Sequence, residues 1–396
     1  MSEFSTEPMF RDTYTIVLRY FRNNLIDVLD DMPWLGKLSW LQLLVYILAV
    51  GSHTGGVLER IANGADMVQL SGDLSATLVL WQVTVLYVEI YGKRKLIKKL
   101  ILNLEALWSS DDKLRLEMEE IKRQSVKSIY KWISQFYKIL TCYMHFYFCL
   151  PFFATAVRHF VLKEDFAFTT IYKLKVPFQY EDNFLLYWVA SMIDYGVLYN
   201  TGLLITSDLL LVNVSMNHLR TLFVILQDDL KNIVHSNEPF EETATSRLKR
   251  IIPKHANLLQ LMAELSEAFG AIFLIHLAFF SGTMCFFGFA ARVHCSPESI
   301  KNLLASSFIL ICIYSCCSYG QDLTDASLDV ANAAYEGPWH LMSHEYRLCI
   351  LFIMLRSQKA YYIRSTSFTN ISLQSFTKIL NVTWSFLSLI DKVYED

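Results

Sequence analysis

Long apolar runs recur along the chain, separated by segments that carry most of the charge. Runs of about 20 residues with few charged side chains are long enough to cross a hydrocarbon core of roughly 30 Å, and so predict membrane helices. They fall at 38–58, 67–91, 132–157, 184–213, 266–291, 302–319 and 367–390. The run from Leu348 to Leu355 is too short to cross and is flanked by Arg347 and Arg356, which predicts part of a buried soluble helix. The pattern therefore predicts an all-α membrane protein with seven transmembrane helices.

Helical periodicity continues outside the predicted spans. In region 214–265, apolar residues such as Leu219, Leu222 and Leu226 are spaced by three or four, as one face of a helix requires. Region 321–355 also has helical spacing, with a break at Gly337-Pro338. These regions predict helix extensions beyond the membrane. Their apolar faces must be buried against one another or against a neighbouring subunit.

Composition and charge narrow the class of protein. The chain of 396 residues is 53% hydrophobic and only 18% charged, and its mean hydropathy is +0.30, which excludes an ordinary soluble domain and favours a lipid bilayer. The net charge of −3 argues against a nucleic-acid partner. Most of the eight cysteines lie in or beside predicted spans, which favours packing residues over a disulfide framework. Charged residues throughout 1–37 argue against a cleavable signal peptide.

Lysine and arginine predict the orientation in the membrane. They are concentrated in segments 1–37, 92–131, 214–265 and 320–366, and are sparse in the segments between. Because basic segments are retained on the cytoplasmic side, we expect a cytoplasmic N-terminus and, after seven crossings, an extracellular C-terminus. A G-protein-coupled receptor has the reverse orientation. Neither its Asp-Arg-Tyr run nor its Asn-Pro-x-x-Tyr run occurs in the sequence.

The last predicted span carries a polar stripe. Its members follow one another at intervals of three or four and so share one helical face: Gln374, Thr377, Asn381, Ser385 and Ser388. Such a stripe cannot face lipid, because buried polar groups need partners. It either forms hydrogen bonds between packed helices or lines a watery path. The residues alone leave both alternatives open.

Candidate binding chemistry is sparse elsewhere. In the fourth predicted span, Trp188, Met192, Tyr195 and Tyr199 share one face. This face could line a mostly apolar ligand pocket, but the residues alone favour simple core packing. His340 and His344 have the spacing of two metal ligands but lack a third ligand, so no metal, other cofactor or enzymatic site is expected.

Three stretches near the C-terminus resemble a known family. They are GQDLTDASLDVANAAYEGPWHLMSHEYR, MLRSQKAYYI and SFTNISLQSFTKIL. The Gly-Gln after the sixth span, Ala-Tyr-Glu-x-x-Trp, Arg-Ser-Gln-Lys and Phe-x-x-x-Ser-Leu-x-x-Phe are similar to the last third of insect odorant receptors. The resemblance covers Gly320–Ile390. Ala360 stands where that family usually has proline, and His340 where tyrosine is common.

The resemblance implies a function. Members are subunits of odorant-gated, non-selective cation channels, in which a subunit tuned to a small volatile odorant joins an obligate co-receptor in a heterotetramer. The compact loop after the fourth span resembles a tuning subunit rather than the co-receptor. The expected location is the plasma membrane of olfactory sensory neurons. The alternative is a seven-span chemoreceptor that signals through intracellular transducers of the G-protein type.

The resemblance also implies a division of the chain and its sites. Spans one to six with the odorant pocket and helix extensions occupy 1–319, a cytoplasmic anchor helix and turn occupy 320–366, and a pore-lining helix with a short extracellular tail occupies 367–396. The pocket is expected among the outer halves of spans two to six, at Leu74, Leu78, Trp81, Tyr143, Phe146, Tyr147, Phe153, Trp188, Met192, Tyr195, Tyr199, Phe279, Phe280 and Phe308. The polar stripe would line the pore. The gate would lie at Leu389 and Val393, with Lys392 beside them, and the subunit anchor at Tyr335, Trp339 and Arg347.

Overall fold

The backbone is a series of long helices. The computed structural model describes residues 8–65, 67–109, 115–163, 168, 170–233, 240–293, 297–366 and 369–395. Within this part of the chain, the α-helices are α1 (Phe10–Asn23), α2 (Pro33–Ala62), α3 (Met67–Ser109), α4 (Leu116–Phe160), α5 (Phe184–Lys231), α6 (Phe240–Val293), α7 (Pro297–Glu336), α8 (His344–Ser357) and α9 (Leu373–Glu395). A short 3-10 turn, η1 (Trp339–Leu341), links α7 to α8. The prediction of an all-α membrane protein is confirmed.

Six of these helices, α2 to α7, are long and apolar enough to cross a membrane. The seventh candidate is α9, which has 23 residues and carries the polar stripe. It begins at Leu373 rather than at residue 367, because β1 (Arg364–Thr366) and β2 (Thr369–Asn370) pair as an antiparallel hairpin just before it. The N–H of Ile371 extends this pairing by donating to the carbonyl oxygen of Ile363 at 2.8 Å. The predicted boundary at 367 is therefore corrected.

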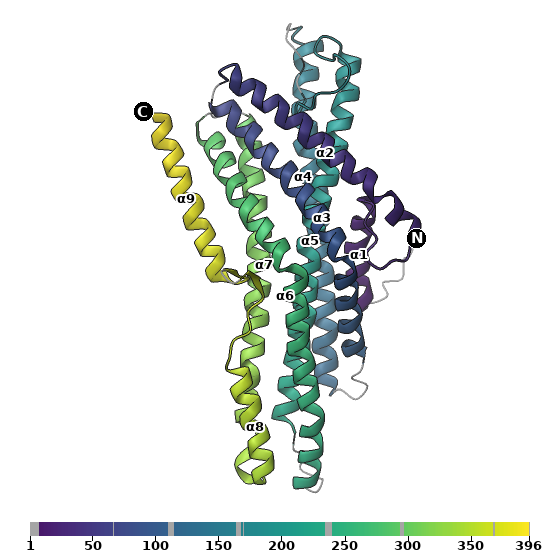
Figure 1. Cartoon of the computed structure of the whole chain (residues 1–396), viewed down its shortest axis with the longest axis vertical. Coiled ribbons are helices and arrows are strands. Elements are labelled where there is room, and N and C mark those ends of the chain that lie inside the picture. Colours follow the sequence, from purple (N-terminus) through teal and green to yellow (C-terminus); the bar gives the residue numbers. More distant parts are fainter. Residues whose placement is uncertain are drawn as a thin grey trace.

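Helices α3 to α7 extend well beyond a membrane. The longest, α6, has 54 residues. At about 1.5 Å per residue this is more than twice the length that a bilayer core requires. In Figure 1 the extensions run side by side in the lower half, with α8 at the lower end, whereas α2 crosses the upper half obliquely and α9 lies at its edge. The predicted helix extensions are present, and the predicted break after α7 falls at Gly337-Pro338.

Helix α5 is at the centre of the bundle. It is buried on all sides from Leu203 to Met216, a stretch that includes several small and polar side chains. Its first turn is capped by Asn183, whose side-chain oxygen accepts hydrogen bonds from the N–H groups of Leu185 and Leu186 at 2.9 and 3.3 Å. A central position explains why α5 can contribute to a site shared by several neighbours.

Helix α8 is buried on one face only. Tyr346, Ile350 and Ile353 pack against the chain, whereas Phe352 and Leu355 are 67% and 56% exposed. The expectation of a buried soluble helix therefore holds for one face in the single chain. The opposite face is apolar and lies open.

Candidate functional site

A partly open cavity lies between five helices in the upper half of the bundle, and the empty space in it, including the space open to the outside, is about 690 Å³. Its lining comes from α3, α4, α5, α6, α7 and the α4–α5 connection: Ala76, Val79, Tyr143, Met144, Tyr147, Tyr172, Leu198, Thr201, Gly202, Ile205, Thr206, Phe280, Phe287, Ala305, Phe308 and Ile309. Among these described lining residues none carries a charge. Mostly apolar walls with a few hydroxyl groups suit a small neutral ligand.

The α5 wall of the cavity is a stripe of small and aliphatic residues. Leu198, Thr201, Gly202, Ile205 and Thr206 recur at the spacing of one helical face. A Cβ added at Gly202 would lie 2.5 Å from Cε of Met144 on α4. Glycine therefore lets Met144 approach α5 closely, and a larger side chain at position 202 would have to displace Met144 or project into the cavity.

The α4–α5 connection covers one end of the cavity through Tyr172. The N–H of Tyr172 donates to Oδ2 of buried Asp194 at 2.7 Å, and its carbonyl oxygen contacts Nδ1 of His53. The next residue, Lys173, forms an ion pair with Asp73, whose Oδ1 lies 2.8 Å from Nζ of the lysine. Asp73 also pairs with Arg60, at 2.8 Å from Oδ2 to Nε. These contacts fasten the connection to α2, α3 and α5.

Four of the fourteen residues predicted for the ligand pocket line this cavity: Tyr143, Tyr147, Phe280 and Phe308. The others do not: Leu74, Leu78, Trp81, Phe146, Phe153, Trp188, Met192, Tyr195, Tyr199 and Phe279. Trp81, Phe146, Phe153 and Trp188 are 45–61% exposed and lie on outer faces of their helices. Their depth in the membrane gave no information about which way they point.

The predicted aromatic face of α5 packs on α4 instead of lining the cavity. The hydroxyl of Tyr195 lies 3.2 Å from Nε2 of His145, and its ring centroid is 4.6 Å from that of Phe148. The ring of Tyr199 also lies against Tyr195. The cavity face of α5 starts at Leu198 and continues one turn deeper, where the side chains are small.

Tyr172 was missed because it lies in a segment without helical or strand periodicity. Thr201, Gly202 and Thr206 were missed because the pocket was sought among large aromatic residues. Their spacing from Leu198 to Thr206 was visible in the sequence. Nothing in one sequence, however, distinguishes a cavity-facing stripe of small residues from a helix-packing stripe.

A buried polar chain lies beside the cavity. Nε2 of His276 on α6 lies 2.7 Å from Oδ2 of Asp208 on α5, and Nδ1 of the same ring lies 3.0 Å from Nε2 of Gln82 on α3. All three side chains are buried. The ring of His276 lies 5.1 Å from that of Phe280, which lines the cavity. The polar chain ties three helices together directly behind a cavity wall.

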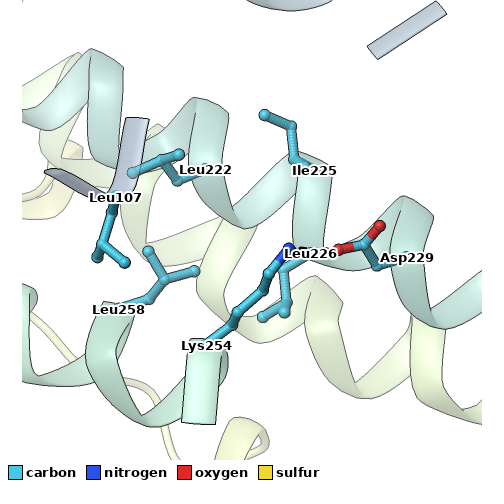
Figure 2. Close-up of a pocket in the computed structure, with 7 residues that line it drawn as sticks. All are labelled: Leu107, Leu222, Ile225, Leu226, Asp229, Lys254 and Leu258. Carbon is cyan, nitrogen blue, oxygen red and sulfur yellow. Dashed lines mark hydrogen bonds and ion pairs between the residues drawn. The ribbon is translucent and has the colours of Figure 1, made fainter. Parts of the chain in front are cut away.

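A second, partly open hollow lies between the lower extensions of α3, α5 and α6, with about 310 Å³ of empty space including the space open to the outside. Figure 2 shows its aliphatic walls and the side chains of Lys254 and Asp229, which point toward one another. Nζ of Lys254 lies 3.2 Å from Oδ2 of Asp229. Because this pair is satisfied internally and the walls belong to helix packing, the upper cavity is the better candidate for a ligand site.

Helix α6 touches both the cavity and α9. Phe280 and Phe287 line the cavity. On the other side, Sγ of Cys285 lies 3.6 Å from the carbonyl oxygen of Thr383, and a Cβ added at Gly288 would lie 3.6 Å from Cδ1 of Leu387. A shift of α6 caused by a ligand would therefore reach α9 directly.

Most of the α9 surface is uncovered by its own chain. The polar stripe is exposed along its length: Gln374, Thr377, Asn381, Ser385 and Ser388. Leu389 is 57% exposed and Lys392 is also exposed. The side chain of Val393 lies outside the described residues. The predicted anchor residues Tyr335 and Arg347 are exposed, and Nε1 of Trp339 donates to the carbonyl oxygen of Tyr335 at 2.9 Å.

Comparison with known proteins identifies the family. Residues 67–384 match the family described as 7tm Odorant receptor. Odorant receptors 85c and 85b of Drosophila melanogaster are each 27% identical to the chain, over 229 and 228 residues. These matches cover 57% and 56% of this chain, and 58% and 57% of the relatives, so the matched region spans little more than half of their length.

The fold is also that of a solved receptor. The olfactory receptor OR5 from Machilis hrabei, in complex with eugenol, superposes with a TM-score of 0.78 at 14% identity. The superposition covers 97% of this chain and 98% of OR5. The structure of OR5 described without eugenol gives a TM-score of 0.76 at 15% identity. On the family match over residues 67–384, the chain belongs to the seven-transmembrane odorant receptor family.

Proposed function

We propose that the protein is an odour-tuned subunit of a ligand-gated, non-selective cation channel. The observation that carries this proposal is the neutral, largely apolar cavity whose α6 wall also contacts α9. The solved complex of OR5, a protein that shares this fold, with eugenol supports a small volatile molecule as the ligand. In this proposal the cavity binds the odorant and α9 lines the pore.

Gating follows from a difference in affinity. An odorant that fits the cavity better in the open arrangement shifts the population toward that arrangement. Phe280 and Phe287 would transmit the change, because both are on α6, which packs against Thr383 and Leu387 of α9. The ligand thus needs no contact with the pore.

The exposed polar stripe of α9 supports a pore-lining role. A polar face on a membrane helix needs water or polar partners, and the chain itself does not cover this face. Apolar side chains at Leu389 and Val393 would close the pore by excluding water. Lys392 beside them would disfavour cations, so its charge is best tolerated if only some subunits in the ring supply it.

The lower helices would form the cytoplasmic anchor between subunits. The exposed fractions of Tyr335, Leu351, Phe352 and Leu355 are 61, 47, 67 and 56%, although these residues lie outside the spans that hydropathy predicts, 302–319 and 367–390. Exposed apolar patches of this kind mark protein interfaces. We assign this face, together with Trp339 and Arg347, to contacts in a heterotetramer with the odorant receptor co-receptor.

The orientation and location complete the proposal. The N-terminus and the helix extensions would be cytoplasmic, and the C-terminus extracellular, in the plasma membrane of olfactory sensory neurons. Functionally, residues 1–319 would bind the odorant, 320–366 would anchor the subunits and 367–396 would line the pore. Because α7 crosses position 320 without a break, anchor and bundle would move as connected parts.

The test is an electrical recording in cells that express the chain with or without an odorant receptor co-receptor. The pipette solution contains no guanine nucleotide, and a panel of volatile odorants is applied. We expect an odour-evoked cation current that requires the co-receptor. A response that disappears when guanine nucleotide is removed would instead favour a receptor coupled to intracellular transducers.

A further inference from the structure

Two hydroxyl groups in the cavity wall have no hydrogen-bond partner. Thr201 and Thr206 of α5 line the cavity, and they are 2% and 1% exposed. Within the part of the chain that the structure describes, neither Oγ1 atom has a partner. Leaving a buried hydroxyl without a hydrogen bond is costly. An unpartnered hydroxyl on a cavity-lining residue is therefore a candidate hydrogen-bond donor to a ligand.

Four threonines elsewhere in these helices satisfy their hydroxyls locally, whereas Thr283 of α6 does not. Thr77, Thr84, Thr221 and Thr324 each donate to the carbonyl oxygen four residues earlier, at 2.8–3.0 Å. This bond is available to a threonine inside any helix. Thr201 and Thr206 do not make it, although both lie well inside α5. Neither hydroxyl is therefore committed to a partner among the described residues, although both threonines belong to the lining of the cavity.

The rest of the lining restricts what can meet these hydroxyls. The described lining residues offer aromatic and aliphatic walls and no charged side chain, so an ionised acid or amine would lose its hydration without an opposite charge. The two threonines are five residues apart, or about 7.5 Å along the helix axis. Because this separation is too large for one ligand oxygen to contact both hydroxyls, the oxygen would bind one threonine while the ligand body occupies the apolar space.

We propose that Thr201 and Thr206 determine the chemical class of the ligand: a neutral volatile with a carbonyl or hydroxyl oxygen on an apolar body, preferred over hydrocarbons of the same shape. The inference rests on the proposed function, since it assigns the cavity to the odorant. A ligand oxygen that accepts a hydrogen bond from either hydroxyl satisfies a group that a hydrocarbon leaves unpaired. Sites built to hydrogen-bond a ligand discriminate strongly against analogues that lack the polar atom.

The test measures binding directly, so that it does not depend on channel activity. The full-length protein is purified, and ligand affinity is measured by intrinsic fluorescence and by the ligand-induced rise in unfolding temperature. The probes are pairs in which a methylene group replaces the carbonyl oxygen: acetophenone against α-methylstyrene, and cyclohexanone against methylenecyclohexane. We expect at least one ketone to bind about 10-fold more tightly than its partner.

Three valine variants assign that preference. Thr201→Val and Thr206→Val, singly and together, keep the shape of the side chain and remove the hydroxyl. Thr283→Val is the matched control, because its Oγ1 is also buried without a partner among the described residues, but Thr283 does not line the cavity. In the double variant the ratio of the two affinities should fall toward 1, whereas Thr283→Val should preserve the wild-type ratio.

The possible results separate the two proposals. Equal binding of ketone and hydrocarbon by the wild type, a ratio unchanged in the double variant, or no binding by any ketone overturns the inference. A preserved ketone preference without any odour-evoked current supports the inference and counts against the channel function.

Discussion

Gly320 lies where α7 passes the hairpin that leads into α9. A Cβ added at this position would lie 2.7 Å from the carbonyl oxygen of Ile371 and 2.6 Å from its Cγ2. Ile371 is fully buried, and its N–H is held by the carbonyl oxygen of Ile363. The added Cβ would therefore meet the backbone of Ile371, and the hydrogen bond from Ile371 to Ile363 restricts how far that backbone can move away. Alanine at position 320 should therefore displace the start of α9, which begins at Leu373.

The magnitude follows from two opposing effects. Replacing a glycine inside a helix by alanine stabilises the helix by up to about 1 kcal/mol. Overpacking at Ile371 should cost about 1–3 kcal/mol. Gly92→Ala is the matched control, because a Cβ there meets no described atom within 4 Å inside a helix of similar length. The difference between the two variants isolates the overpacking cost.

The assay is thermal unfolding of the purified variants in detergent. For a chain of 396 residues, about 1 kcal/mol corresponds to roughly 1 °C in the unfolding midpoint. Gly320→Ala should therefore unfold about 1–3 °C below Gly92→Ala. Its resting current should also change, because α9 is displaced at its first turn. If Gly320→Ala is stabilised to the same degree as Gly92→Ala and its resting current is unaltered, the close approach at Ile371 has no energetic consequence.

Three further predictions concern the polar chain, an acid-sensitive contact and the gate. His276→Ala leaves the Asp208 carboxylate without its partner, which should cost about 3–5 kcal/mol of stability and reduce the amount of receptor labelled at the cell surface. Adding Asp208→Asn should recover much of the lost stability and surface labelling. An equal loss in the double variant would assign the effect to packing. Burial, with Arg356 adding to it, lowers the pKa of His255 to about 4. The imidazole is therefore protonated near pH 6.5 in the unfolded chain but stays neutral in the folded chain, so the free energy of unfolding should fall by about 1–2 kcal/mol from pH 7 to 5. In His255→Asn this part of the pH dependence of stability should be absent. Leu389→Ser should raise the resting current, and an unchanged closed state would argue against this position as the gate.

Hydropathy and periodicity were sufficient for the fold class. Crossing a bilayer requires about 20 apolar residues in a helix, so the spans and their extensions appear in the sequence itself. The start of α9 could not be predicted in this way. Residues 367–372 contain no charged residue, proline or glycine that would mark a boundary, and β1 and β2 are too short to give a pattern. That turn depends on the close approach of Ile371 to Gly320, which is a tertiary contact.

The ligand site was only partly predictable for a related reason. Tyr143, Tyr147, Phe280 and Phe308 were selected by depth and aromatic character, and the same criteria selected Trp188, which lies outside the cavity. Depth along a helix can be read from the sequence. The direction a side chain faces depends on neighbouring helices, and the small residues of the α5 wall, such as Gly202, could not be recognised by a search for large aromatic residues.

The most direct test of the account compares two substitutions on one helix. Gly202→Leu should fill the cavity from α5 and displace Met144. Gly196 does not line the cavity, and a Cβ added there meets no described atom within 4 Å, so Gly196→Leu is the control. Odour-evoked current is recorded in nucleotide-free excised patches with the co-receptor, at matched surface expression. We predict that Gly202→Leu raises the half-maximal odorant concentration at least 10-fold and that Gly196→Leu responds as the wild type does. A normal response from Gly202→Leu, or a wild-type current that requires guanine nucleotide, would contradict the account.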